Sequence, residues 1–459
     1  MATSAAVAEL RQRLGTRLTT SDTELSAHGR DESYHHPMPP EAVAYPESTE
    51  EVAAVVRTCH DHGVPMVPYG IGTSLEGNVA ALHGGVSIDL SLLNRVLEVR
   101  ADDLDVSVQA GVTRRQLNNV LQPQGLFFPV DPGADATLGG MAATGASGTT
   151  TVRYGTMREN VLSLTVVLAD GRVIRTRRRA RKSSAGYDLT RLFVGSEGTL
   201  GVITELTLRI YGTPEAMSAA VCSFPTVEAA VQTVIRTIQL GIPIARAELL
   251  DAVAVDAVNR HSGLDHPVGP TLFLEFHGSS AGVREQAEAV AEIGAEHAAG
   301  ETRTATLAED RNRLWRARHE ALYAVLALRP GSRALITDVC VPISALAGCI
   351  AETQADLAAS SLIASVVGHV GDGNFHTVFL VDPDSAAEVG EARALNRRMV
   401  ERALEMGGTC TGEHGIGHGK REYLRAEHGD GVDVMVAIKR ALDPLNLMNP
   451  GKVVGPEES

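Results

Sequence analysis

The chain has 459 residues, of which 44% are apolar, so we expect about three domain-sized units with buried cores. Its formal net charge of −15 excludes a general nucleic-acid-binding protein, because such proteins present clustered positive charge to phosphates. No run of about 20 apolar residues occurs, so no membrane span is expected.

The N-terminal stretch and the cysteines indicate a compartment. The first thirty residues lack the apolar core of a secretory signal. Five scattered cysteines, without a Cys-x-x-Cys pair, are typical of reduced thiols in a cytoplasm. They are Cys59, Cys222, Cys340, Cys349 and Cys410. We therefore predict a cytoplasmic protein, with Cys410 as a structural or incidental thiol.

The first part of the chain predicts a helix, a strand and a glycine-rich loop. After an amphipathic helix at residues 5–14, Ser48 and Glu51 form a capping box for a helix that stops at Gly63. A short strand at 64–68 then runs into the loop Gly70 to Gly77. Small residues in such a loop let backbone N–H groups point at an anion, which predicts a phosphate cradle. The motifs of nucleotide triphosphatases and Rossmann dinucleotide sites are both absent from this loop.

Residues 86–210 alternate strand patterns with glycine-rich stretches. Strands are predicted at 86–90, 95–99, 105–110, 161–168, 173–175 and 202–210, and a helix capped by Thr113 at 113–121. The stretch 129–148 is too rich in small residues to predict a packed element. It is a flexible linker or a wall for a large planar ligand, and its mixture of Pro, Asp, Met and Leu favours the wall. The basic run 175–182 is a solvated loop or a docking patch for an acidic redox partner.

Near Pro214 the pattern changes to a separate α+β domain. Strands are predicted at 219–224, 245–250, 271–276, 334–339 and 364–367. Helices are predicted at 227–240, 282–297, 307–328, 342–358 and 386–406, with a further helix in the tail at 432–442. No internal repeat is present.

Two stretches near the end of this domain predict a site. Asp372-Gly373 lies between two apolar runs and predicts a type I′ hairpin turn. That turn would place His369 and His376 directly opposite each other on one face, with Cβ atoms roughly 5 Å apart. Such a pair is either polar surface or two ligands of Zn²⁺, Mn²⁺ or Fe²⁺. The glycine-rich loop 408–420 carries Glu413, His414 and His418. Of these, Glu413 could supply the carboxylate that completes a metal site with two histidines and one carboxylate.

Six motifs, taken together, resemble those of a known family. They are residues 68–77, 131–134, 195–201, 369–376, 412–417 and 449–452. In this order they resemble the FAD-linked oxidases of the vanillyl-alcohol oxidase type. The resemblance runs from about residue 40 to 455, and is strongest to the branch of acceptor-linked D-lactate dehydrogenases, glycolate oxidase flavoprotein subunits and D-2-hydroxyglutarate dehydrogenases.

The resemblance implies an α+β fold with four segments. These are an N-terminal segment (1–39), an FAD-binding domain of two α+β subdomains (40–214), an α+β substrate or cap domain with a metal site (215–425), and a C-terminal segment returning to the FAD domain (426–459). It also implies an FAD site whose pyrophosphate is held by the loop Gly70 to Gly77. The implied FAD-binding residues are Pro68, Gly70, Ile71, Gly72, Thr73, Ser74, Leu75, Gly77, Asn78, Pro129, Asp131, Thr137, Gly140, Ala143, Thr144, Ser147, Gly148, Glu197, Gly198, Ile203 and Asn449.

The resemblance further implies His369, His376 and Glu413 as ligands of a divalent metal (Zn, Mn or Fe). It makes His414 the general base and Arg318 the binder of the substrate carboxylate; Arg318 is otherwise a helix-surface salt bridge. Ile336 and Val378 stand where the 2-hydroxyglutarate enzymes have a Lys and an Asn. Both changes remove polar partners for a second carboxylate, which favours a monocarboxylate such as lactate.

The implied reaction is oxidation of a D-2-hydroxy acid, D-lactate first, to the 2-oxo acid by hydride transfer to flavin N5. The alternatives are a glycolate or D-2-hydroxyglutarate dehydrogenase, an oxygen-using oxidase, and a non-catalytic flavin-binding subunit of a larger complex. The glycine loop has no His, so FAD is expected to be non-covalent. Expected partners are the hydroxy acid and an electron acceptor such as a cytochrome, a quinone or an electron-transfer flavoprotein, with a homodimer as an open possibility.

Overall fold

The computed structural model describes residues 2–455 and divides into two compact units. The first unit comprises residues up to Ser147, Gly155–Thr213 and the segment from Glu413 onward. The second comprises Gly148–Tyr154 and Pro214–Gly412. None of the described helices is long and apolar enough to cross a membrane. All five cysteines carry free thiols.

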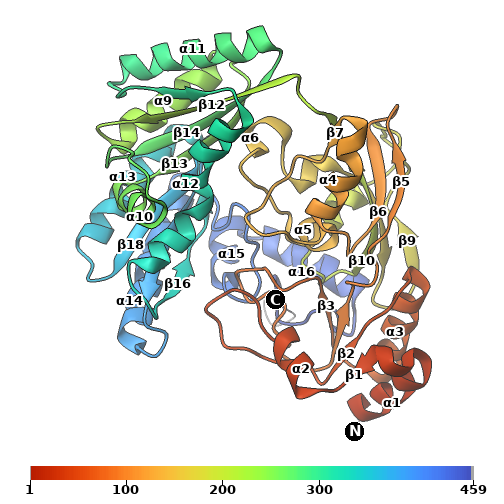
Figure 1. The fold of residues 1–459 in the computed structure, drawn as a ribbon. Coiled ribbons are helices and arrows are strands. Elements are labelled where there is room, and N and C mark those ends of the chain that lie inside the picture. Colours follow the sequence, from red (N-terminus) through yellow and green to blue (C-terminus); the bar gives the residue numbers. More distant parts are fainter. Residues whose placement is uncertain (1, 456–459) are drawn as a thin grey trace. The chain divides into compact units, whose positions relative to one another are not determined.

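The first unit is built on two main sheets (Figure 1). The four-stranded sheet has the order β1-β2-β4-β3, in which β2, β4 and β3 are parallel. The antiparallel five-stranded sheet has the order β5-β6-β10-β8-β9. The strands are β1 (Leu18–Thr19), β2 (Ala42–Ala44), β3 (Met66–Tyr69), β4 (Val86–Asp89), β5 (Val96–Arg100), β6 (Asp105–Gln109), β8 (Val161–Val167), β9 (Val173–Arg175) and β10 (Val202–Arg209), with β7 (Leu126–Phe127) and β11 (Tyr211–Gly212) forming a small separate pair.

Helices of the first unit begin where the sequence supplies caps. The side chain of Ser48 accepts from Glu51 N at the start of α3, and that of Thr113 accepts from Gln116 N at the start of α4. Both predicted helices are therefore confirmed. The helices are α1 (Ala2–Leu14), α2 (Asp22–His28), α3 (Thr49–His62), α4 (Arg114–Leu121), α5 (Leu138–Thr144), α7 (Met157–Asn160), α8 (Leu189–Phe193), α15 (Arg421–His428) and α16 (Gly431–Leu442), with 3₁₀ turns at Gly15–Arg17 and Gln122–Gln124.

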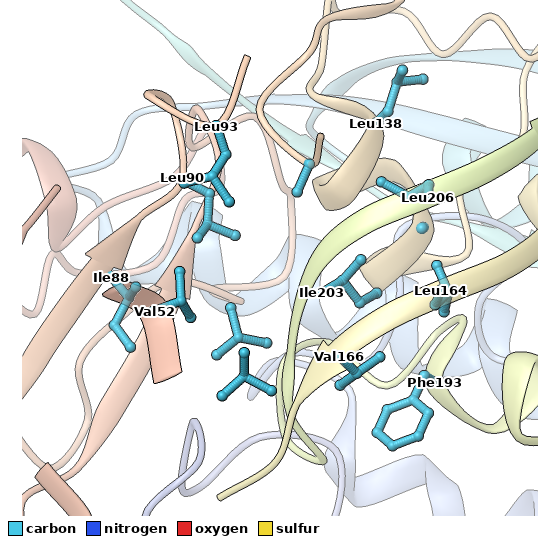
Figure 2. Close-up of a cluster of buried hydrophobic side chains, with 14 of the residues drawn as sticks. Val52, Ile88, Leu90, Leu93, Leu138, Leu164, Val166, Phe193, Ile203 and Leu206 are labelled. Atoms are coloured by element: carbon cyan, nitrogen blue, oxygen red, sulfur yellow. The ribbon is translucent and has the colours of Figure 1, made fainter. Parts of the chain in front are cut away.

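One apolar core joins the two sheets of the first unit. Figure 2 shows Val52 of α3 and Ile88 of β4 in the same cluster as Leu164 and Val166 of β8 and Ile203 of β10. All are at most 5% exposed. Burial of this apolar surface is the main term that stabilises the unit, and it fixes the ends of β3 and β10 from which the glycine-rich loops extend.

The prediction of no packed element at residues 129–148 was wrong. The helix α5 occupies part of this stretch, and the Thr137 side chain caps it by accepting from Gly140 N. A Cβ atom on Gly139 would lie 2.6 Å from the Cβ of Ala110. The small residues therefore allow the helix to approach the neighbouring backbone closely, which composition alone does not distinguish from a loop.

The second unit is built on an eight-stranded sheet, and helices cover both faces of this sheet (Figure 1). The strand order is β15-β12-β14-β13-β18-β19-β16, with β17 also paired to β19. The strands are β12 (Ala216–Ser223), β13 (Ile244–Leu250), β14 (Thr271–Gly278), β15 (Arg303–Ala305), β16 (Arg333–Ile336), β17 (Val339–Cys340), β18 (Ile363–His369) and β19 (Asn374–Val381). The helices are α6 (Thr151–Tyr154), α9 (Val227–Gln239), α10 (Ala252–Ser262), α11 (Ser280–Glu296), α12 (Ala308–Ala327), α13 (Ile343–Ala358) and α14 (Ala386–Glu405).

Helices α10 and α12 pack against each other and against one face of this sheet. Their apolar side chains meet Leu250, Phe273, Val367 and Val378. Side chains alternate between the two faces along a strand. A charged residue two positions before or after one of these apolar residues therefore lies on the same face of the sheet. The predicted strands and helices of this region are confirmed in kind, whereas α10 and, in the first unit, α15 were not predicted.

Candidate functional site

The loop that follows β3 is suited to an anion. Gly72 and Gly77 have positive φ angles of 69° and 70°, which glycine adopts without strain. Within residues 2–455, no partner is found for the five consecutive backbone N–H groups from Ile71 to Leu75. A run of available amide donors is the chemistry that a phosphate group requires. The loop therefore fits the pyrophosphate of a dinucleotide.

Asp31 fixes this loop from outside. Its carboxylate accepts from the Ser74 hydroxyl at 3.2 Å and from the backbone N–H of Asn78 at 2.9 Å. Glu32 N also donates to Ser74 O at 3.0 Å. The segment that holds the loop comes from the region before residue 40, for which the sequence predicted no role. Sequence reasoning did not single out Asp31, which holds the loop through these contacts.

Other predicted FAD-binding residues gather around the loop. A Cβ atom on Gly70 would lie 2.6 Å from the Thr137 hydroxyl oxygen, and one on Gly198 would lie 2.9 Å from the Pro68 ring. Ala143 O accepts from Glu197 N at 2.8 Å. The start of α5 and the loop before β10 therefore lie beside the end of β3. Gly148, by contrast, belongs to the short segment that packs in the second unit.

Glu197 joins several segments of the first unit. Its carboxylate accepts from the Asn78 side-chain amide at 2.5 Å and from the backbone N–H groups of Ile416 and Gly417 at 2.7 and 2.8 Å. Burial raises the pKa of Glu197 to about 7, although these donors act in the opposite direction. The carboxylate, predicted to contact FAD, is therefore engaged with protein donors in the structure.

Asn449 and Lys452 complete this junction. The Asn449 amide donates to Asn78 O at 3.1 Å and to Glu197 O at 2.8 Å. Lys452 Nζ donates to Asn449 Oδ1 at 3.0 Å, and burial lowers the pKa of Lys452 to about 8. The side chain of Asn449 thus holds the C-terminal segment to the glycine loops. Its direct contact with FAD stays a prediction.

The two histidines of the hairpin lie on one face, as predicted, but they are not directly opposite. His369 pairs with Asn374, and His376 pairs with Val367, so the histidines are diagonal neighbours. Their ring centroids are 5.4 Å apart. The predicted two-residue turn was wrong because four residues, Val370 to Gly373, connect the strands. Contacts outside the hairpin hold this wider loop: Val341 N donates to Gly373 O at 3.0 Å.

Each histidine is oriented through its Nδ1 atom. His376 Nδ1 lies 2.9 Å from the Thr337 carbonyl oxygen, which can only accept, so Nδ1 carries the hydrogen. His369 Nδ1 lies 2.7 Å from Glu248 Oε1. In the neutral rings the lone pairs are then on Nε2, the atom that a metal would bind. This arrangement, with an acceptor behind each ring, fits a metal centre better than a solvated surface pair.

Glu413 offers a carboxylate to the same group. It directly follows Gly412, the last residue of the second unit, and its oxygen and the ring nitrogens of His369 and His376 all lie within 4.8 Å of one another. The Ser147 hydroxyl donates to Glu413 Oε2 at 2.5 Å. Two imidazoles and one carboxylate form a donor set suited to a divalent transition metal with open positions.

Arg318 lies on α12 and contacts Glu248. Its Nε donates to Glu248 Oε2 at 2.7 Å. Burial raises the pKa of Glu248, but the charges of His369 and Arg318 outweigh burial, so this pKa lies below its ordinary value. Arg318 does form a salt bridge, as the alternative predicted, but the pair does not lie on the surface, because the Arg318 side chain is only 17% exposed and Glu248 is fully buried.

His414, the predicted base, lies in the first unit near a buried carboxylate. Its Nδ1 is 3.7 Å from Glu76 Oε1, and Lys420 Nζ is 3.2 Å from the same oxygen. The His414 side chain is 9% exposed. The Glu76 carboxylate thus lies near both a histidine and a lysine. It is an acceptor that could orient the neutral imidazole of His414.

Sequence reasoning did not single out Glu248 or Thr337, whose oxygen atoms lie against Nδ1 of His369 and of His376. Glu248 had a signal, because it is a carboxylate on a strand whose residues are mostly apolar. Thr337 acts through its backbone carbonyl, which no side-chain motif reveals. Glu248 and His369 are 121 positions apart, and Thr337 and His376 are 39 positions apart, so no local pattern connects either pair.

With this geometry established, the sequence matches two family descriptions. Residues 40–177 match "FAD binding domain", and residues 213–453 match "FAD linked oxidases, C-terminal domain". The chain therefore belongs to the FAD-linked oxidase family, which confirms the family predicted from the motifs. It is an FAD-dependent oxidoreductase.

Within that family, the chain is similar to proteins named as D-lactate dehydrogenases and as a glycolate oxidase subunit. The chain is 54% identical over 431 residues to "Probable D-lactate dehydrogenase, mitochondrial" of Danio rerio, covering 93% of this chain and 87% of that protein. It is 48% identical over 453 residues to "D-lactate dehydrogenase [cytochrome], mitochondrial" of Arabidopsis thaliana, covering 98% and 80%. It is 35% identical over 419 residues to "Glycolate oxidase subunit GlcD" of Bacillus subtilis, covering 90% and 89%.

Solved structures confirm the fold. The structure of p-cresol methylhydroxylase with substrate bound has a TM-score of 0.78 at 17% identity, covering 100% of this chain and 98% of that one. A 4-ethylphenol oxidase from Gulosibacter chungangensis gives a TM-score of 0.79 at 19% identity, with coverages of 100% and 98%. The predicted α+β architecture of the vanillyl-alcohol oxidase type is therefore correct.

Proposed function

We propose that the protein is a D-lactate dehydrogenase that oxidises D-lactate to pyruvate, using FAD and a divalent metal at His369, His376 and Glu413. The observation that carries the reaction is the 54% identity over 431 residues to a probable D-lactate dehydrogenase. The metal is supported by the two histidines whose Nδ1 atoms face acceptors at 2.7 and 2.9 Å. FAD, when bound, would supply the two-electron acceptor for the hydride that leaves Cα.

The residues of the second unit support binding of a 2-hydroxy acid. A metal held by the two imidazoles and the carboxylate would bind the substrate through its carboxylate and α-hydroxyl and make that hydroxyl more acidic. Arg318 would pair with the substrate carboxylate. Its Nε is occupied by Glu248, which leaves the two Nη groups as a fork for that carboxylate.

His414 is proposed as the base that takes the hydroxyl proton. Histidine suits this task because its ordinary pKa is close to working pH. Glu76, 3.7 Å from His414 Nδ1, would stabilise the imidazolium that results. The loop Gly70 to Gly77 would hold the pyrophosphate of FAD through its backbone N–H groups, without a covalent bond to histidine.

Preference for a monocarboxylate is supported by the strand next to the histidines. Val378 follows His376 by two positions on β19, so it lies on the same face, and its cross-strand partner is Ile336 of β16. Neither side chain offers a partner to a second carboxylate. D-lactate is therefore favoured over D-2-hydroxyglutarate.

The electron acceptor, the homodimer and the cytoplasmic location stay predictions. Relatives are named as cytochrome-linked and mitochondrial, and an external electron acceptor rather than oxygen is proposed on that basis. Stopped-flow reoxidation of the reduced protein by cytochrome c, a quinone analogue or oxygen would rank the acceptors. Faster reoxidation by oxygen than by the others would contradict the proposal and favour an oxidase.

The first test is an anaerobic visible spectrum of the purified protein before and after each of four substrates. We expect D-lactate to bleach the flavin band, with L-lactate, glycolate and D-2-hydroxyglutarate having little effect. Bleaching by glycolate instead would favour the alternative suggested by the glycolate oxidase relative. A flavin band that none of the four changes would move the substrate elsewhere, or indicate a non-catalytic flavin subunit.

A further inference from the structure

Glu248 is a fully buried charge in the middle of β13. The residue is 0% exposed, and its strand is otherwise formed mostly by buried apolar side chains. Burying a carboxylate is unfavourable unless both of its oxygens are well paired. A buried carboxylate therefore needs a hydrogen-bond partner for each oxygen, and each oxygen of Glu248 has one.

The two oxygens of Glu248 join two elements of the second unit. Oε1 contacts Nδ1 of His369, at the end of β18, and Oε2 accepts from Nε of Arg318, on α12. Both distances are 2.7 Å. The carboxylate therefore constrains the ring of one proposed metal ligand and the guanidinium of the proposed substrate-binding residue at once.

We propose that Glu248 is a positioning residue that aligns the metal ligand His369 and the substrate-binding Arg318 with each other. This inference rests on the proposed function. Holding the hydrogen of His369 on Nδ1 keeps the lone pair on Nε2, and an acceptor at this place strengthens metal binding. Holding Arg318 by Nε directs its Nη edge away from Glu248, so that the edge is available to a carboxylate.

The second unit offers a matched control in Glu275. This residue lies on the neighbouring strand β14, is 5% exposed, and has the same two kinds of partner. His277 Nε2 lies 2.7 Å from Glu275 Oε1, and Arg246 Nη1 lies 3.6 Å from Glu275 Oε2. Neither His277 nor Arg246 belongs to the proposed metal or substrate groups. Replacing Glu275 therefore tests the general cost of losing a buried carboxylate.

The experiment compares the full-length wild type with the variants Glu248→Gln and Glu275→Gln. The Gln side chain is uncharged and has one accepting oxygen in place of two, so either the His369 ring or the Arg318 guanidinium then faces an NH2 group, which cannot accept. Each flavin-loaded protein is stripped of metal by a chelator and titrated with Mn²⁺ by calorimetry. We expect Mn²⁺ to bind about 10- to 100-fold more weakly to Glu248→Gln than to wild type. Glu275→Gln should match wild type.

Kinetics supply a second readout. Because Arg318 would bind the ground-state carboxylate, Glu248→Gln should raise KM for D-lactate at saturating Mn²⁺, whereas Glu275→Gln should not. Glu248→Asp keeps the charge, but its side chain is one methylene shorter and cannot reach both partners at 2.7 Å. It should give intermediate values, and it replaces Glu248→Gln if that variant does not retain flavin.

The outcomes separate this inference from the function on which it rests. Wild-type protein that binds no Mn²⁺, Zn²⁺ or Fe²⁺ would overturn the proposed metal centre, and the role of Glu248 with it. Wild type that binds metal, together with Glu248→Gln and Glu248→Asp that both keep wild-type metal affinity and KM, would overturn the role of Glu248 alone. Equal losses in Glu248→Gln and Glu275→Gln would also overturn it, since the effect would be structural.

Discussion

Gly77 and His418 lie so close that a Cβ atom on Gly77 would be 2.2 Å from Nε2 of His418. The glycine closes the loop proposed to hold the FAD pyrophosphate, and the histidine comes from the part of the first unit that begins at Glu413. His418 N also donates to Glu76 O at 3.1 Å. The loop thus depends on a residue that lies more than three hundred positions away in the sequence.

Replacing Gly77 with Ala should weaken FAD binding. The new side chain would strain a backbone with φ of 70° and displace His418, at a combined cost of about 2 to 5 kcal/mol. We expect FAD affinity, measured by fluorescence on rebinding to apoprotein, to fall at least about tenfold. Gly63→Ala is the matched control, because Gly63 has φ of 63° but open space around it. Equal FAD affinity in the two variants would show that His418 does not support the loop.

His418 should also make the stability of the protein depend on pH. Burial, followed by the charges of His35 and Lys452, lowers the pKa of His418 to about 4. Between pH 6.5 and 4 the unfolded chain binds a proton on this residue that the folded chain does not. The free energy of unfolding therefore decreases as the pH falls through this range.

The pH effect can be measured as the fall in Tm between pH 7 and pH 5. We expect a smaller fall in His418→Gln than in wild type, because the variant has no titrating group at this position. The exposed His428 provides the control, and His428→Gln should follow wild type. Parallel Tm profiles for wild type and His418→Gln would contradict the assignment.

The apolar pair of Ile336 and Val378 should determine substrate length. In the double variant Ile336→Lys/Val378→Asn, two polar groups replace direct cross-strand partners on β16 and β19. A charged partner for a second carboxylate contributes about 1.5 to 3 kcal/mol, so kcat/KM for D-2-hydroxyglutarate relative to D-lactate should rise about 10- to 100-fold. The double variant Ile336→Leu/Val378→Ile is the control and should keep the wild-type ratio. No change in the ratio for the polar variant would place the end of the substrate elsewhere.

Removing one proposed metal ligand should abolish metal binding while leaving the flavin in place. His376→Ala leaves two of the three proposed ligands. We expect the amount of bound metal per chain, measured by elemental analysis, to fall about tenfold or more. Turnover of D-lactate should fall at least about 100-fold. His266→Ala removes a buried histidine of the same unit that is not part of the three-ligand group, and should keep metal. Full activity in His376→Ala would reject the metal mechanism.

The sequence by itself determined the family, the order of most helices and strands, and the stretches that carry the chemistry. It did so because caps such as Ser48 and Thr113, alternating apolar strands and glycine loops act over a few residues. The pair His369 and His376 was assigned to one face because side-chain alternation is a local rule, and the structure confirms it.

Tertiary structure decided what depends on residues distant in the chain. The register of the histidine hairpin differs from the local turn rule because Val341 holds the loop at Gly373. The helix α5 forms in a stretch of small residues because Ala110 packs against Gly139. The role of Glu248 depends on β18 and α12 meeting β13. These contacts are made by long-range packing, and their energies exceed the local preferences that sequence patterns report.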